Sequence, residues 1–122
     1  MKITITPNRN LVRVSFAGHA IAETIRALDL AEGDAPRVIY VPRADVDLEL
    51  CTPADLVTHC PRKGDAVYFD IVIHDRTSHN ALWSYENPLP AAAAIAGYVA
   101  FDPARVDSII EHQQELRGGS LA

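Results

Sequence analysis

Hydrophobic and polar residues alternate in two separate stretches within the first sixteen positions of the chain. The alternating apolar positions are Ile3, Ile5, Val12, Val14 and Phe16. A period of two is typical of strands that are buried on one face only. Ala17-Gly18 then offers a turn. The pattern predicts two strands at the start of the chain.

The next apolar positions leave two interpretations open. Residues 19–30 fit a hairpin that continues through Ile21, or a helix that uses Ile25 and Leu28. We favour a strand followed by an irregular turn. Residues 38–41 form a short apolar run closed by Pro42, which has no N–H for a sheet and therefore ends a strand or marks an edge.

Residues 43–64 form the least regular part of the pattern, with prolines at 53 and 61. We expect loops here, interrupted by a short strand over residues 47–51. Loops on a rigid scaffold commonly carry binding and catalytic residues. This segment is therefore the first place to look for a site.

The clearest strand covers residues 66–74 and is followed by a second strand. On the first, an apolar face alternates with a face that includes Tyr68 and Asp70, and the second carries Trp83 and Tyr85. With an even-length loop between them, cross-strand partners have opposite parity. We therefore expect these four side chains on one face, whereas an odd loop or a bulge would move Trp83 into the core.

The last third of the chain predicts helices. An alanine run after Pro90 and before Gly97 predicts a short helix near 91–96, and a short strand follows over 98–101. Asp102-Pro103 resembles a helix start, and apolar residues recur at helical spacing, which predicts a helix near 103–116. We expect a mainly β fold with a few helices (α+β), a single domain over 1–117 and a flexible tail over 118–122.

Size and charge restrict the class of protein. The chain has 122 residues, of which 48% are hydrophobic, so one domain with one core is expected. The net charge is −5 and the basic residues are scattered, which argues against nucleic-acid binding. No apolar stretch approaches the roughly 18 residues of a membrane span, so we expect a cytoplasmic protein. In that compartment Cys51 and Cys60 would stay unpaired.

Four stretches of sequence resemble a known bacterial family, the domain of unknown function 427. The resemblance spans nearly the whole chain and rests on Tyr40-Val41-Pro42-Arg43-Ala44-Asp45-Val46, on Thr58-His59-Cys60-Pro61-Arg62-Lys63-Gly64-Asp65-Ala66-Val67-Tyr68, on Trp83-Ser84-Tyr85, and on residues 94–101. It implies a compact domain of curled antiparallel sheets, related to tent-like β folds. It implies little about activity.

A nucleotidyltransferase label is sometimes attached to this family, and the residues give it little support. Nucleotidyl transfer usually needs a Gly-rich or basic phosphate-binding loop and carboxylates that hold Mg²⁺. Asp45 and Asp47 supply two carboxylates, but no such loop precedes them. A pair of this kind is common by chance in an acidic protein, so we interpret both as surface acids.

Cys60 is the residue most suited to covalent chemistry. His59 and Lys63 could lower the pKa of its thiol, and Pro61 stiffens the adjacent backbone. Against this, free cysteine is commonly a buried core residue, and no partner for a catalytic relay is evident. A zinc site built from Cys51, His59 and Cys60 would need His74 or His79 as well and lacks CxxC spacing, so we expect no metal and no cofactor.

Arg43, Lys63, Tyr68, Trp83 and Tyr85 together resemble a ligand pocket. Cations could hold an anionic group and aromatic rings could cover an apolar portion. Aromatic strand residues more often belong to the core, but the shared face with Asp70 favours recognition. We expect Arg43 and Lys63 to reach one concave site that binds an unknown small molecule, polar or anionic. The alternative is a small enzyme that uses Cys60 or Lys63 as its catalytic residue on the same ligand.

Overall fold

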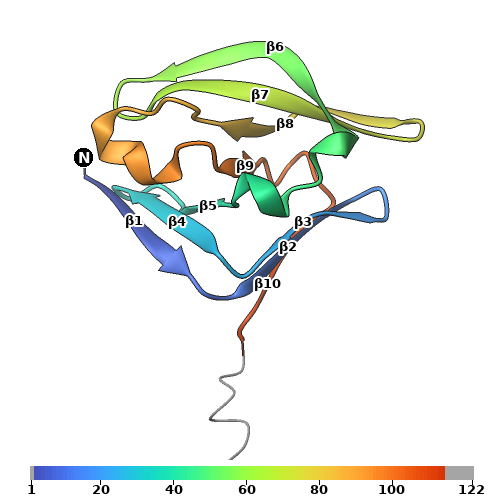
Figure 1. Cartoon of the computed structure of the whole chain (residues 1–122), viewed down its shortest axis with the longest axis horizontal. Helices are drawn as coiled ribbons and strands as arrows, with labels where there is room; N and C mark the ends of the chain where they lie inside the picture. Colours follow the sequence, from blue (N-terminus) through green and yellow to red (C-terminus); the bar gives the residue numbers. More distant parts are fainter. Residues whose placement is uncertain (1, 115–122) are drawn as a thin grey trace, which may run out of the picture.

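A computed structural model describes residues 2–114, which form ten β-strands in three antiparallel sheets (Figure 1). The first sheet has the order β1 (Ile3–Asn8), β4 (Ala27–Glu32), β5 (Val38–Tyr40). The second has the order β10 (Ser108–His112), β2 (Leu11–Phe16), β3 (His19–Thr24). The third has the order β6 (Cys51–Cys60), β7 (Gly64–Ile73), β8 (Arg76–Ser84), β9 (Val99–Phe101). Three short 3-10 helices also occur in these residues: η1 (Arg43–Asp45), η2 (Leu48–Leu50) and η3 (Pro90–Ile95).

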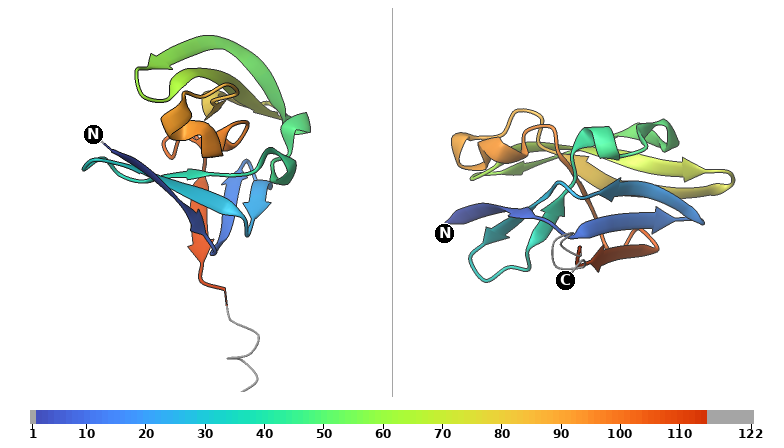
Figure 2. Two further views of the ribbon diagram at one scale, coloured as in Figure 1. Left: turned by 60° about the vertical axis from the view of Figure 1, so that its left-hand side comes forward. Right: turned by 60° about the horizontal axis from the view of Figure 1, so that its bottom comes forward.

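The third sheet lies across from the other two, and the core fills the space between them (Figures 1 and 2). Val41 and Val99 join the two sides, because each backbone N–H donates to the other's carbonyl oxygen at 2.7 and 2.8 Å. One buried cluster centres on residues such as Ile21, Ile71 and Leu82. A second cluster contains Tyr40, Tyr85 and Ile95 and lies near η3. No helix of residues 2–114 is long and apolar enough to cross a membrane.

The strands predicted at the start of the chain are confirmed. Val12, Val14 and Phe16 are buried while their neighbours on β2 are partly exposed, as a half-buried strand requires. Ala17 and Gly18 both have positive φ, 50° and 78°, which suits a two-residue hairpin turn.

The strand that we favoured after this turn is also confirmed, as β3, but the irregular turn beyond it is short. Residues 27–32 form the further strand β4. The Thr24 hydroxyl accepts a hydrogen bond from the Arg26 backbone N–H at 2.9 Å, so a polar side chain closes the corner between the two strands.

The segment 43–64 is more regular than the sequence pattern predicts. The strand expected over 47–51 is wrong, because residues 48–50 form η2 and the strand β6 begins at Cys51. Pro53 is accommodated because β6 pairs only with β7, so its other edge needs no N–H donor. The register shifts between Pro53 and Val57, which absorbs the irregularity without ending the strand.

The predicted register of the central hairpin is confirmed at its key pair, because Tyr68 lies directly opposite Trp83. The pairing shifts between Phe69, opposite Leu82, and Ile71, opposite Ser78. An advance of two residues along β7 therefore corresponds to an advance of four residues along β8. An even number of extra residues preserves the alternation of faces, so this irregularity leaves Trp83 beside Tyr68.

The two predicted helices have different outcomes. The helix expected near 91–96 is present as the 3-10 helix η3, with non-helical torsions at Ala92. The helix expected near 103–116 is wrong, because residues 108–112 form β10, which pairs with β2 and places Ile109 opposite Val14. The Asp102 side chain does accept a hydrogen bond from the Ala104 backbone N–H at 2.9 Å, as a helix cap would. Here, however, this hydrogen bond closes a turn, and residues 103–114 contain no helix. The predicted flexible tail, 118–122, lies outside the described residues.

Candidate functional site

A small pocket of about 200 Å³ lies where the sheet β1-β4-β5 meets the sheet β6-β7-β8-β9. We call it the tyrosine pocket. Its lining residues come from five separate stretches of the chain: Leu30, Glu32, Ala35, Pro36, Val38, Tyr40, Lys63, Tyr68, Trp83 and Tyr85. The pocket therefore brings together four of the residues that the sequence pattern singled out, namely Lys63, Tyr68, Trp83 and Tyr85.

The aromatic wall of the tyrosine pocket is held by side-chain contacts. The Trp83 indole N–H donates to the Tyr40 hydroxyl oxygen, with 3.2 Å between the nitrogen and the oxygen. The Tyr68 and Trp83 ring centroids are 6.2 Å apart and the rings are tilted, an arrangement that aromatic pairs favour. Burial raises the pKa of Tyr40, so its phenol stays protonated at neutral pH. These contacts give the pocket a pre-formed wall.

Lys63 reaches the pocket from the tight turn between β6 and β7. The Lys63 backbone N–H donates to the Cys60 carbonyl oxygen at 3.2 Å, and its carbonyl oxygen accepts from the Leu89 N–H at 2.9 Å. Gly64 follows with a φ of +105°, which side-chain-bearing residues rarely adopt. The turn thus depends on glycine, and it is anchored at both sides of Lys63.

The Lys63 ammonium is balanced by one carboxylate. Its Nζ atom lies 2.7 Å from Glu32 Oε1, and Arg62 also pairs with Glu32. Hydrogen bonds from Lys63 and then Arg62 lower the pKa of Glu32. Burial by itself would lower the pKa of Lys63. The hydrogen bond to Glu32 and the electrostatic interactions with Tyr85 and Cys60 outweigh burial, so the pKa of Lys63 is raised. Arg62 does not line the pocket, but it gives the cluster of Lys63, Arg62 and Glu32 beside the pocket a net charge of +1.

Cys60 packs against the same buried cluster as Tyr40 and Tyr85. Burial opposes ionisation of its thiol, but the backbone N–H groups of Arg62 and Lys63 and the Lys63 ammonium favour it, and the pKa of Cys60 is lowered. Such a shift suits a reactive thiol. His59, which the sequence placed beside Cys60, instead pairs with Asp65, with 2.7 Å between Nδ1 and Oδ1.

Cys51 differs from Cys60 in position and in chemistry. The two residues lie at opposite ends of β6, and both thiols are unpaired, as predicted. Burial and the charge of Asp47 raise the pKa of Cys51 to about 11. Residues 2–114 contain no group of three or more His, Cys, Asp or Glu side chains placed to hold a metal ion.

Arg43 does not line the tyrosine pocket, contrary to our expectation of a site shared with Lys63. Its guanidinium donates to the Gly97 carbonyl oxygen and to the Ser84 hydroxyl, both at 3.2 Å, and pairs with Glu86 at 3.0 Å. Ser84 is fully buried. Because residues 84 and 83 alternate on β8, the arginine braces the sheet from the face opposite Trp83.

Asp70 is likewise outside the lining of the pocket. Its carboxylate accepts from the Asn80 backbone N–H at 2.8 Å and contacts His79 Nδ1 at 3.2 Å. Asn80 has a φ of 54° and lies among the extra residues of β8. The Asp70 carboxylate therefore binds the backbone at the place where the register shifts. Its role in the structure is to stabilise the irregular register.

Among the lining residues that the sequence pattern does not predict, Glu32 and Tyr40 have polar side chains. Tyr40 lies in one of the sequence stretches that carry the family resemblance, and it could have been found there. Glu32 is 31 positions from Lys63, and no local pattern links them. Only the packing of β4 against the β6–β7 turn shows the pair.

Asp45, one of the two carboxylates considered for Mg²⁺, has structural partners. The Asp45 carboxylate accepts from the Thr24 hydroxyl at 2.7 Å and pairs with Arg26 at 3.1 Å. The hydrogen bond from Thr24 lowers the pKa of Asp45, and Arg26 adds to this effect against the opposing influence of burial. These contacts join η1 to the β3–β4 corner and give Asp45 a role in folding.

Fold and site together define a small antiparallel β domain with a pre-formed aromatic pocket between two of its sheets. The sequence model of the family called domain of unknown function 427 (DUF427) matches residues 4–112, and the chain belongs to this family. Comparison with curated proteins gives no match.

Proposed function

We propose that this domain binds a small polar or anionic molecule in the tyrosine pocket. The observation that carries the proposal is the convergence of Lys63 with Tyr68, Trp83 and Tyr85 on one pocket, from three separate stretches of the chain. A few polar groups placed among aromatic walls are typical of small-molecule sites. The volume of about 200 Å³ lies below the ~300–1,000 Å³ of drug-sized sites, which favours a small ligand or a small ligand group.

The charges favour an anion over a cation. An ammonium group has three donors, and Glu32 occupies one of those of Lys63. The Tyr40 oxygen accepts from Trp83, which leaves its own proton able to point to a ligand acceptor. Donors and a net positive charge beside the pocket suit a carboxylate or a similar group.

The charge preference can be tested with two aromatic probes of similar size and opposite charge. Trp83 is the only tryptophan of the chain, so its fluorescence reports on the pocket directly. We expect benzoate to bind more tightly than benzylammonium. Lys63→Met should weaken benzoate binding about tenfold, the equivalent of roughly 1.4 kcal/mol. The matched control is Lys2→Met, which changes the other lysine of the chain. Lys2 is exposed, so this substitution should not change benzoate binding.

Two results would contradict the proposal: tighter binding of benzylammonium, or equal benzoate affinities for the Lys63→Met variant and the unaltered protein. Thermal unfolding of each variant would show whether it is folded under the conditions of the titration.

The lowered pKa of Cys60 supports a second candidate function, a small enzyme in which this thiol, or Lys63, acts on the bound molecule. Cys60 does not line the tyrosine pocket, but it packs against the cluster that contains Tyr40 and Tyr85, so a nucleophile near the ligand is part of this second proposal. A cytoplasmic location, the curling of the sheets and a relation to tent-like β folds stay predictions of the sequence.

A further inference from the structure

A second hollow, of about 320 Å³, lies next to the tyrosine pocket and is mostly apolar. We call it the valine pocket. Its lining residues are Val12, Val14, Arg37, Val38, Ile39, Val41, Trp83, Phe101, Pro103 and Ile109. The valines at 12, 14 and 41 are each 1% exposed, so the floor of the hollow is the protein core itself. An apolar hollow of this size suits hydrocarbon better than water.

The two pockets share a wall. Val38 and Trp83 line both, and both are partly exposed, so the wall between the pockets reaches the surface. The hydrogen bond from Trp83 to Tyr40 holds the indole in this position. A molecule lying over the edge of Val38 and Trp83 could therefore occupy both hollows.

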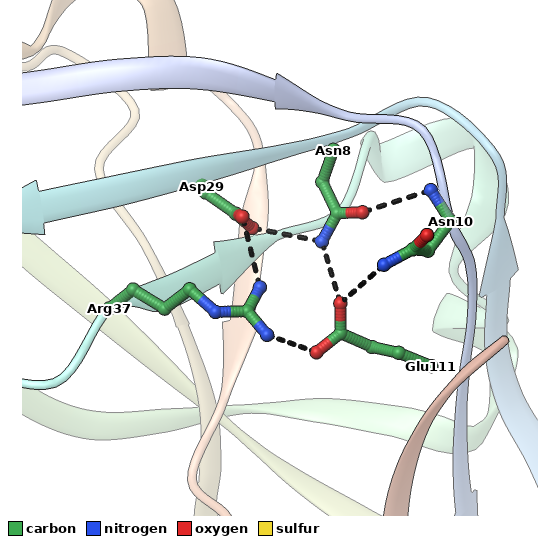
Figure 3. A network of polar contacts seen from close by, with 5 residues as sticks. All are labelled: Asn8, Asn10, Asp29, Arg37 and Glu111. Carbon is green, nitrogen blue, oxygen red and sulfur yellow. Dashed lines mark hydrogen bonds and ion pairs between the residues drawn. The ribbon is translucent and has the colours of Figure 1, made fainter. Parts of the chain in front are cut away.

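The charge around Arg37 differs from that around Lys63. Arg37 is the one charged residue among those that line the valine pocket, and it pairs with Asp29 at 2.9 Å and also with Glu111 (Figure 3). Asn8 donates to both carboxylates at 3.0 Å. The cluster of Arg37, Asp29 and Glu111 therefore has a net charge of −1, whereas the cluster of Lys63, Arg62 and Glu32 has a net charge of +1. An anionic group is therefore favoured only in the tyrosine pocket.

We propose that the ligand is an amphipathic monocarboxylate, whose carboxylate lies near Lys63 and whose aliphatic chain crosses Trp83 into the valine pocket. This inference rests on the proposed function, because it places the head group in the tyrosine pocket. The valine pocket has room for about ten water-sized groups at ~30 Å³ each, which corresponds to a chain of medium length.

Chain length is the variable that tests this inference. The unaltered protein is titrated with acetate, butanoate, hexanoate and octanoate, with Trp83 fluorescence as the readout. Burial of each further methylene should tighten binding about threefold to fourfold, the equivalent of ~0.8 kcal/mol per CH₂. An octylammonium titration gives the charge control and should show much weaker binding than octanoate.

A substitution that fills the valine pocket provides the second test. Ile109→Phe adds volume to a lining residue on β10, whereas Ile110→Phe changes the next residue, which is 40% exposed and does not line the pocket. We expect Ile109→Phe to abolish the advantage of octanoate over butanoate and Ile110→Phe to preserve it. If Ile109→Phe does not fold, the chain-length series on the unaltered protein decides the question.

The outcomes separate the two proposals. Affinities that are equal for butanoate and octanoate but depend on Lys63 would overturn the amphipathic ligand and leave the proposed function intact. If the Lys63→Met variant binds carboxylates with the same affinity as the unaltered protein, the proposed function itself is overturned. A chain-length dependence that Ile109→Phe leaves unchanged would place the chain elsewhere and contradict the inference.

Discussion

Lys63 Nζ lies 2.7 Å from Glu32 Oε1, although 31 residues separate the two along the chain. This ion pair joins the β6–β7 turn to the end of β4 and closes one side of the tyrosine pocket. The side chains are 13% and 14% exposed, so water screens the pair only weakly. Glu32 therefore holds Lys63 in place and also competes with any anionic ligand for its charge.

Glu32→Gln should have opposite effects on stability and on binding. Loss of a charged hydrogen bond is expected to lower the free energy of unfolding by about 1–3 kcal/mol. Benzoate should bind several-fold more tightly, because the competing charge is gone. Urea denaturation and fluorescence titration measure the two effects, and Glu49→Gln, at an exposed glutamate, is the control. Weaker benzoate binding would show instead that the Glu32 carboxylate assists the ligand.

Arg43→Ala should destabilise the domain without changing ligand affinity. The substitution removes hydrogen bonds to the Gly97 carbonyl and to the buried Ser84 hydroxyl, at a cost of about 1–3 kcal/mol. Arg26→Ala, at a side chain that is 62% exposed, should cost less than about 1 kcal/mol. Chemical denaturation of both variants gives the comparison. Loss of benzoate binding by folded Arg43→Ala protein would mean that Arg43 reaches the ligand after all.

Acid should destabilise the domain through Glu111. A hydrogen bond from Arg37, with further ones from Asn8 and Asn10, lowers the pKa of Glu111 from 4.5 to about 2. A carboxylate with a lowered folded-state pKa stabilises the protein above its unfolded pKa, and this contribution is lost as the pH falls from about 4.5 to 2. The expected loss is at most about 3 kcal/mol. The Glu111→Gln variant should show a flatter dependence of unfolding free energy on pH over this interval, and an unchanged slope would contradict the assignment.

Cys60 should react with an alkylating reagent at a lower pH than Cys51 does. The pKa of Cys60 is below its ordinary value and that of Cys51 is about 11, so their thiolate fractions at pH 8 should differ by on the order of a hundredfold. Mass spectrometry after a short iodoacetamide pulse locates the label. Lys63→Met should raise the pKa of Cys60 and slow its labelling. Earlier labelling of Cys51 would remove the support for a reactive Cys60.

The central hairpin shows how far local pattern can predict a site. Tyr68 and Trp83 were placed on one face by parity alone, and the structure pairs them directly. Parity predicts the correct face because the extra residues of β8 are even in number, which the sequence pattern does not show. Asp70 lies on the same alternating series but at the irregular position, and there its carboxylate binds backbone instead of facing the pocket.

The C-terminal segment shows where pattern is ambiguous. Ile109 and Ile110 fit a helix by spacing, yet they are adjacent β-branched residues, which also suit a strand. The edge of β2 decided the outcome, because a strand at residues 108–112 pairs with it and buries Val106 and part of Ile109 against the core. An available sheet edge is a property of the folded chain and cannot be found in a local window of sequence.

Local sequence patterns were enough to predict the mainly β class, the family, the unpaired cysteines and the hairpin that carries Tyr68 and Trp83. The cation that joins these aromatic residues could be identified only from the packing of distant strands. Arg43 and Lys63 are equivalent in the sequence, as basic residues beside backbone-restricting ones. In the folded chain Lys63 pairs with Glu32 beside the aromatic wall, whereas Arg43 contacts Ser84 on the opposite face of β8. Which side of a sheet a loop residue reaches depends on contacts between distant strands, so local pattern could not predict it.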